Sequence, residues 1–146
     1  MFKKIMVPLD GSSFAEEALP YARGLAEYAR ATILLARVDE GHEPPPGVFV
    51  PATAIPEVFQ LSAGEYLEQQ AARLTMGGLA VQTIVLEGRV PDALLRCARD
   101  ESVDLIVMST HGRTGLSRLL MGSVAEQIVH GAPCPVLLIR PQARST

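Results

Sequence analysis

Aromatic residues and cysteine are scarce in this chain of 146 residues. Tryptophan is absent, phenylalanine and tyrosine together supply 5% of the residues, and the only cysteines are Cys97 and Cys134. The two cysteines have neither a Cys-x-x-Cys partner nor the spacing of metal ligands, so they predict no metal site and do not argue for an oxidising compartment. For Cys97, which falls on an amphipathic segment, we expect a buried apolar role.

An excess of positive charge is also lacking. The 13 basic residues are outnumbered by 16 acidic ones, which gives a net charge of −3. With no basic run or interleaved aromatic patch, the sequence offers no electrostatic footprint for nucleic acid or for an anionic membrane. No apolar run approaches the length of a membrane span, and the apolar stretch before Asp10 is too short for a signal peptide. We expect a cytoplasmic protein with no nucleic-acid partner and no membrane partner.

Several catalytic signatures are missing as well. No Gly-Lys pair occurs anywhere, which excludes a P-loop of the G-x4-G-K-[S/T] type. His42, His111 and His130 are not accompanied by a recognisable carboxylate and nucleophile, and they predict no metal site built from protein ligands alone. These absences argue against an enzyme but leave the question open.

The chain does show a regular alternation of strand and helix patterns. Its length and its hydrophobic content of 48% suit one domain that spans residues 1–146. The alternation predicts an α/β fold, with a parallel sheet and helices on both faces. Residues 41–57 are rich in proline, and we expect a surface loop inserted after the second strand rather than a docking site for a proline-reading partner. The expected strands are residues 5–9, 32–38, 81–86, 105–108 and 136–139.

Helix starts and interruptions are marked by short motifs. Ser13 and Glu16 form a capping box that opens the first helix. Pro20 lies inside the helical pattern of that segment and predicts a bend. A second helix is expected from residue 58 to about residue 76.

The stretch from residue 104 to residue 139 organises the rest of the chain. An apolar strand is followed by a polar loop with glycines, and then by a helix that Ser123 and Glu126 open as a capping box and Gly131 ends. A strand, a glycine loop and a helix N-terminus together make an anion site. Unpaired amides and the positive end of the helix dipole converge there, and glycine lets a phosphate approach the backbone.

The loop in this stretch resembles the G-x2-G-x9-G-[S/T] loop of the nucleotide-binding universal stress proteins. Gly112, nine further residues, Gly122 and Ser123 match its last fixed positions, and Ser109 stands in place of its first glycine. The resemblance extends to IMVPLDGS at residues 5–12 and to VLLIR at residues 136–140. It therefore spans nearly the whole chain.

This resemblance implies a doubly wound, open parallel sheet of five strands in the order 3-2-1-4-5. Ligands bind such sheets beyond the carboxyl ends of the strands where the strand order reverses, here between the first and fourth strands. The resemblance also implies ATP as the ligand, with Mg²⁺ held through the phosphates. The residues expected to contact the nucleotide are Pro8, Asp10, Val38, Ser109, His111, Gly112, Arg113, Gly122, Ser123 and Val124.

Three of these residues have other interpretations. Asp10 is either a turn residue or a partner for adenosine. We favour the second because Ser13 and Glu16 already cap the helix, which leaves the Asp10 carboxylate available. Ser123 caps the last helix whether or not it also contacts phosphate. His111 is expected to be a loop residue anchored to the backbone.

By the same strand order, the fifth strand lies at a sheet edge, and an apolar edge invites pairing with a second chain. We expect a two-fold homodimer through Val136, Leu137, Leu138 and Ile139. The expected function is that of an ATP-binding regulatory dimer that responds to nucleotide in the stress response, with at most slow ATP hydrolysis. One alternative is a stress-response dimer without nucleotide that acts by protein interaction. A less favoured one is an ATP-consuming phosphotransferase.

Overall fold

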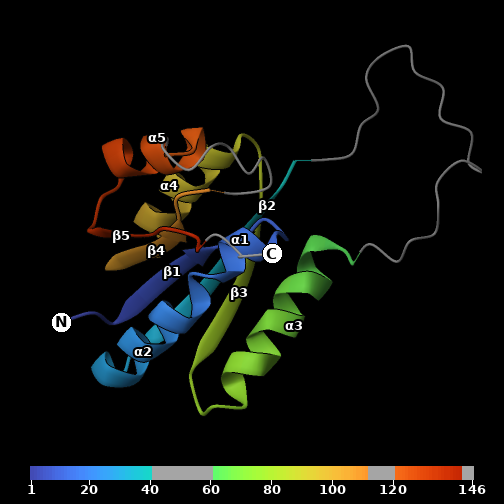
Figure 1. Cartoon of the computed structure of the whole chain (residues 1–146), viewed down its shortest axis with the longest axis vertical. Helices are drawn as coiled ribbons and strands as arrows, with labels where there is room; N and C mark the ends of the chain where they lie inside the picture. Colours follow the sequence, from blue (N-terminus) through green and yellow to red (C-terminus); the bar gives the residue numbers. More distant parts are fainter. Residues whose placement is uncertain (41–60, 112–120, 143–146) are drawn as a thin grey trace, which may run out of the picture.

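The computed structural model describes residues 1–40, 61–111 and 121–142, and its strands form one parallel sheet (Figure 1). The strand order is β3-β2-β1-β4-β5, which confirms the expected fold class and order. The elements are, in chain order, β1 (Lys4–Pro8), α1 (Ser13–Glu16), α2 (Leu19–Ala29), β2 (Thr32–Asp39), α3 (Ala63–Thr75), β3 (Val81–Glu87), α4 (Val90–Asp100), β4 (Leu105–Ser109), α5 (Ser123–Gly131) and β5 (Val136–Ile139). The proline-rich segment 41–57 lies outside the described residues.

Two layers of helices cover the sheet, one on each face (Figure 1). Alternate residues of a strand point to opposite faces, and this alternation divides the core in two. In β1, Ile5 and Val7 pack with α1, α2 and α3, whereas Met6 packs with α4 and α5. β4 is buried along its whole length, as its unbroken apolar run predicts for a central strand.

The strand order reverses at β1, because β2 and β3 follow on one side of it and β4 and β5 on the other. β1 pairs with β2 on one side, through Lys4↔Thr32 to Pro8↔Ala36, and with β4 on the other, through Ile5↔Leu105 and Met6↔Ile106. The segments that follow β1 and β4 therefore leave the sheet at the same edge and diverge to opposite faces. This arrangement produces the crevice where open α/β sheets hold their ligands.

The first helical segment differs from the expected single bent helix. Two helices are present, and Pro20 lies in the first turn of α2, where its missing amide hydrogen costs no helical bond. Ser12, and not Ser13, is the N-cap of α1, because its side chain accepts a hydrogen bond from the Ala15 amide at 3.2 Å. Ser12 has the extended backbone that a cap requires, with φ of −81° and ψ of 151°.

The two later helices also begin differently from expectation. α3 begins at Ala63 rather than at residue 58, and Ser62 and Glu65 form a reciprocal capping box at its start. In α5 the expected cap, Ser123, is instead the first helical residue, and Gly122 occupies the N-cap position with no side-chain hydrogen bond. The expected end of α5 at Gly131 is confirmed.

Two further sequence expectations can be compared with the described residues. Cys97 is buried against the sheet on α4, as predicted, and burial is the main cause of the raised pKa of its thiol. Among the helices of the described ranges, none is both long and apolar enough to span a membrane.

Candidate functional site

A cavity of about 300 Å³ opens at the carboxyl ends of the strands, where the sheet reverses. This volume is at the lower end of the range typical of small-molecule pockets. The predicted site residues in its wall are Pro8, Asp10, Val38, Ser109, His111, Gly122, Ser123 and Val124. Gly112 and Arg113 lie outside the described residues. The fold thus brings together side chains that are more than one hundred positions apart in the sequence.

Asp10 lies at this cavity but is not spare, contrary to the sequence interpretation. Its Oδ1 accepts hydrogen bonds from the Ser12 amide at 2.9 Å and from the Ser12 hydroxyl at 2.5 Å. The same Ser12 hydroxyl oxygen accepts from the Ala15 amide. Asp10 therefore builds the turn that starts α1, and these contacts also fix the direction of its carboxylate at the cavity wall.

The end of β4 contributes a compact set of polar groups. Ser109 is buried, and its hydroxyl oxygen accepts a hydrogen bond from the His111 amide at 3.3 Å. The Thr110 hydroxyl and His111 Nδ1 are 2.9 Å apart. The other ring nitrogen, Nε2, is buried and has no hydrogen-bond partner among the described residues. A buried polar atom without a partner is costly, so Nε2 has a hydrogen-bonding capacity that no described residue uses.

Gly122 brings the start of α5 against the end of β4. Its amide donates to the Thr110 carbonyl oxygen at 2.8 Å, and a Cβ on Gly122 would lie 2.8 Å from that same oxygen. The backbone has φ of −61° at this position, which any residue adopts. Glycine is required here by the close approach of a backbone carbonyl, and not by the unusual φ that a glycine loop suggests.

The N-terminus of α5 forms part of the cavity wall. The first amides of a helix have no partner within the helix, and at α5 no side chain of the described residues caps them. Ser123, Val124 and Ala125 line the cavity at this point. Unpaired amides and the positive end of the helix dipole together favour an anion.

Another part of the cavity lining is mainly apolar. It is formed by side chains that the sequence analysis did not single out, with Val38 as the exception. They come from α4, β2 and β4, namely Val90, Leu94, Val38 and Met108. Glu40 also lines the cavity, so that two carboxylates and no lysine or arginine of the described residues lie in its wall. The described residues contain no cluster of three or more potential metal ligands.

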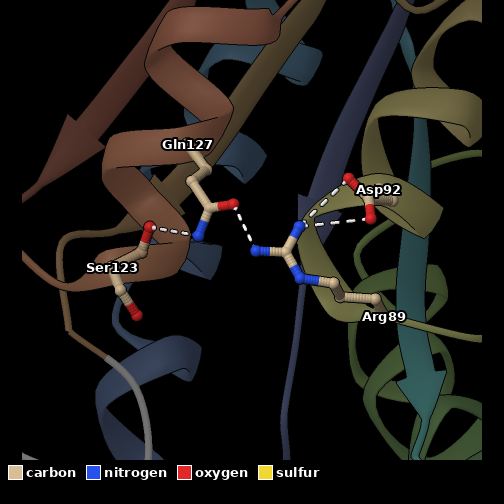
Figure 2. Close-up of polar contacts among 4 residues, drawn as sticks. All are labelled: Arg89, Asp92, Ser123 and Gln127. Carbon is tan, nitrogen blue, oxygen red and sulfur yellow. Dashed lines mark hydrogen bonds and ion pairs between the residues drawn. The ribbon is translucent and has the colours of Figure 1, made fainter.

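A polar bridge joins α4 to α5 beside the cavity (Figure 2). Arg89, at the N-cap of α4, donates to both carboxylate oxygens of Asp92 at 3.2 and 3.1 Å and to Gln127 Oε1 at 2.7 Å. Gln127 Nε2 in turn donates to the Ser123 carbonyl oxygen at 3.3 Å. The bridge links the start of α4 to the start of α5. Val90 and Val124, which lie at these two helix starts, line the cavity. Nothing in the local sequence signals the bridge, because its partners are 38 positions apart.

Comparison with known proteins identifies relatives of this chain. The model of the universal stress protein family matches residues 1–140. A universal stress protein of Methanocaldococcus jannaschii, MJ0531, is 34% identical over 144 residues, covering 96% of this chain and 83% of its own length. One from Thermus aquaticus is 34% identical over 142 residues, covering 96% of this chain and all of its own.

Solved structures agree with this assignment. A crystal structure of a family member from Burkholderia pseudomallei has a TM-score of 0.71 and 32% identity, and the match covers 97% of both chains. A universal stress protein in complex with cAMP, and one from Arabidopsis thaliana with AMP bound, share the fold at 18% and 19% identity. Their TM-scores are 0.69 and 0.68; the matches cover 97% and 99% of this chain, and 99% and 95% of theirs. The chain belongs to the universal stress protein family.

Proposed function

We propose that this chain binds an adenine nucleotide, with ATP and its Mg²⁺ as the preferred form, in the cavity beyond β1 and β4. The observation that carries the proposal is that two unlike kinds of group line one cavity. The start of α5 contributes amides that no side chain of the described residues caps, and β2 and α4 contribute apolar side chains. An anionic group suits the amides and a flat heterocycle suits the apolar side chains.

The proposed orientation of the nucleotide follows from these two kinds of lining. Phosphates are assigned to the amides of Ser123 and Val124, and the base to the apolar wall formed by Val38, Val90 and Leu94. The ribose then lies between them, near Asp10, because a carboxylate accepts hydrogen bonds from hydroxyl groups and repels phosphate. Mg²⁺ is carried by the phosphates, since it is commonly bound through substrate oxygens and water.

The family supports the same ligand class. Relatives of the same fold hold AMP and cAMP, which share adenine, ribose and phosphate. His111 supports it from within the chain, because this residue lines the cavity and its buried Nε2 has no hydrogen-bond partner among the described residues. A ribose hydroxyl or a phosphate oxygen is a suitable partner for it.

Calorimetric titration with Mg-ATP, ADP, AMP and cAMP tests this proposal. Asp10→Asn is the informative variant. Its side-chain oxygen can still accept the hydrogen bonds from Ser12, but it lacks the negative charge that strengthens hydrogen bonds from the ribose hydroxyls. We expect it to weaken ATP binding by about tenfold, the effect of losing a charge-assisted hydrogen bond. Asp100→Asn, an exposed change at the far end of α4, is the matched control. Equal affinities for wild type and Asp10→Asn contradict the assigned orientation.

We further propose that the chain is a homodimer through β5, and that nucleotide occupancy regulates this dimer. Within the described residues β5 pairs only with β4, so its outer edge is open to a second strand. Leu137 is 37% exposed there, whereas Val136 and Leu138 pack toward the helices of the α4 and α5 face.

Leu137→Lys is therefore the variant that tests the interface without damaging the core. Light scattering is expected to find a dimer for wild type and a monomer, or a weaker dimer, for Leu137→Lys. The control is Val85→Lys on β3, the opposite edge, where the side chain is 44% exposed. A wild-type monomer at micromolar concentration argues against the dimer, and a dimer unchanged by ATP argues against its regulation.

A further inference from the structure

Arg37 lies behind the cavity wall and contacts the turn that holds Asp10. It follows Ala36 in β2 and precedes Val38, whose side chain lines the cavity. Alternation along the strand sends Arg37 to the opposite face, toward α1 and α3. There its Nη1 and Nη2 atoms lie 3.3 Å from the point where a Cβ of Gly11 would be.

The contact with Gly11 is made at a conformationally special residue. Gly11 has φ of +87°, a region that side-chain-bearing residues rarely adopt. It connects Asp10 to Ser12, the two residues whose hydrogen bonds fix the carboxylate at the cavity wall. The Arg37 guanidinium group therefore packs on the residue at the centre of this turn.

The same guanidinium group also contacts Tyr66 of α3. Its Cζ atom lies 4.9 Å from the centroid of the Tyr66 ring, a cation–π contact. Tyr66 is itself buried, at 8% exposure, and so is its neighbour Gln70, which donates to Glu16 Oε1 at 3.1 Å. Burial, and then the nearby charges of Glu16 and Asp10, raise the pKa of Tyr66, while the Arg37 charge opposes this shift. Arg37 is thus the cation beside the buried Tyr66 ring, near which the partly buried carboxylates of Glu16 and Asp10 also lie.

We propose that Arg37 is a positioning residue for the nucleotide site, acting through the Asp10-Gly11-Ser12 turn and not by touching the ligand. The planar guanidinium group can pack flat on the glycine backbone and on an aromatic ring at the same time, which a lysine ammonium group cannot. Removing it lets the turn relax, and the Asp10 carboxylate loses its fixed direction. This inference rests on the proposed nucleotide function.

A double-mutant cycle on nucleotide affinity tests the proposal. Arg37→Met keeps the aliphatic stem and removes the guanidinium group; Arg37→Gln is the second variant should the methionine protein not fold. We expect Arg37→Met to weaken Mg-ATP binding by about tenfold, within the range of coupling between contacting residues. In an Asp10→Ala background the same change should have little further effect, because its route to the ligand is gone. Arg73→Met, an equal charge change at an exposed site late in α3, should leave affinity unchanged.

Two further measurements distinguish a failure of this inference from a failure of the proposed function. Arg37→Lys restores the charge but not the plane, and it should bind nearly as weakly as Arg37→Met. Without nucleotide, the Ser12 amide, which donates to Asp10, should exchange its hydrogen faster in Arg37→Met than in wild type. Additive effects in the cycle, full rescue by lysine, or unchanged Ser12 exchange each overturn the role of Arg37. A wild-type chain that binds no nucleotide, with Ser12 exchange still faster in Arg37→Met, overturns the proposed function and leaves only the structural contact.

Discussion

Replacing Gly122 by alanine is the substitution for which the structure gives the clearest quantitative expectation. The added Cβ would lie 2.8 Å from the Thr110 carbonyl oxygen, closer than real contacts allow. A backbone carbonyl cannot rotate away as a side chain can, so the start of α5 must separate from the end of β4. The hydrogen bond from the Gly122 amide to the same oxygen, also 2.8 Å long, is strained by that movement.

The magnitude follows from two opposing contributions. Forcing extra atoms into a packed site costs about 1–3 kcal/mol. Alanine at φ of −61° also restricts the unfolded chain, which returns about 0.4–1 kcal/mol. We therefore expect Gly122→Ala to lower the free energy of unfolding by roughly 1.5 kcal/mol. Nucleotide affinity should fall as well, because Thr110, His111 and the first turn of α5 move apart in the cavity wall.

Urea unfolding of three proteins measures this effect. Gly24→Ala is the matched control, because Gly24 is exposed within α2 and its added Cβ would meet nothing within 4 Å. That change should stabilise the protein by about 0.5–1 kcal/mol, since glycine is a poor helix former. If Gly122→Ala is as stable as wild type, or gains stability as Gly24→Ala does, the close approach of Thr110 and Gly122 is refuted.

Three other expectations follow from the described contacts. Asp104 accepts hydrogen bonds from the Lys3 and Lys4 amides at 2.8 and 2.9 Å, and these bonds lower the pKa of its carboxyl group. The contribution of Asp104 to stability is therefore present at neutral pH and is lost as the pH falls through the lowered pKa. Asp104→Asn should lower the free energy of unfolding by about 1 kcal/mol at pH 7. Urea unfolding at several pH values should also show a weaker dependence of stability on acid pH in this variant. The Arg89–Gln127 bridge is exposed, so a double-mutant cycle with Arg89→Gln and Gln127→Ala should give a coupling of only about 0.2–1 kcal/mol to stability; a coupling well above that range shows a stronger tie between α4 and α5. Phosphate release from Mg-ATP should stay below the roughly 1 per second of ordinary enzymes, and turnover at such rates contradicts a purely regulatory role.

The order of elements could be predicted from the sequence because each strand is a short apolar run between helical patterns. No end of a predicted strand lies more than one residue from the observed end, since an apolar run and a buried strand coincide closely in a parallel sheet. The strand order itself came from the resemblance to the family. Periodicity carries no information on which strands are neighbours.

The caps were predicted less well, because adjacent residues compete for one position. Ser12 and Ser13 are equally suitable by type, and only the extended backbone of Ser12 decides between them. The error had a consequence for Asp10, whose carboxylate was taken as unused but accepts two hydrogen bonds from Ser12. At α5 the capping pattern of Ser123 and Glu126 is present in the sequence, yet Gly122 takes the cap position where it meets Thr110.

The apolar half of the candidate site could not be found in the sequence. Val90 and Leu94 are ordinary helix residues whose position beside Val38 depends on how α4 packs over β2. Arg37 and Tyr66 likewise meet only because α3 covers the opposite face of the sheet. Motifs report on residues close in sequence, whereas these contacts are made by the tertiary packing.

The most direct test of the central claim is a nuclear magnetic resonance titration that follows the backbone amides while Mg-ATP is added. We expect the largest shifts on Ser123 and Val124 at the start of α5, on the turn from Asp10 to Ser12, and on His111. Amides at the opposite end of the sheet, such as Lys4 and Thr32, should remain unchanged. No shift at millimolar Mg-ATP, or shifts concentrated away from the carboxyl ends of β1 and β4, would contradict nucleotide binding at this site.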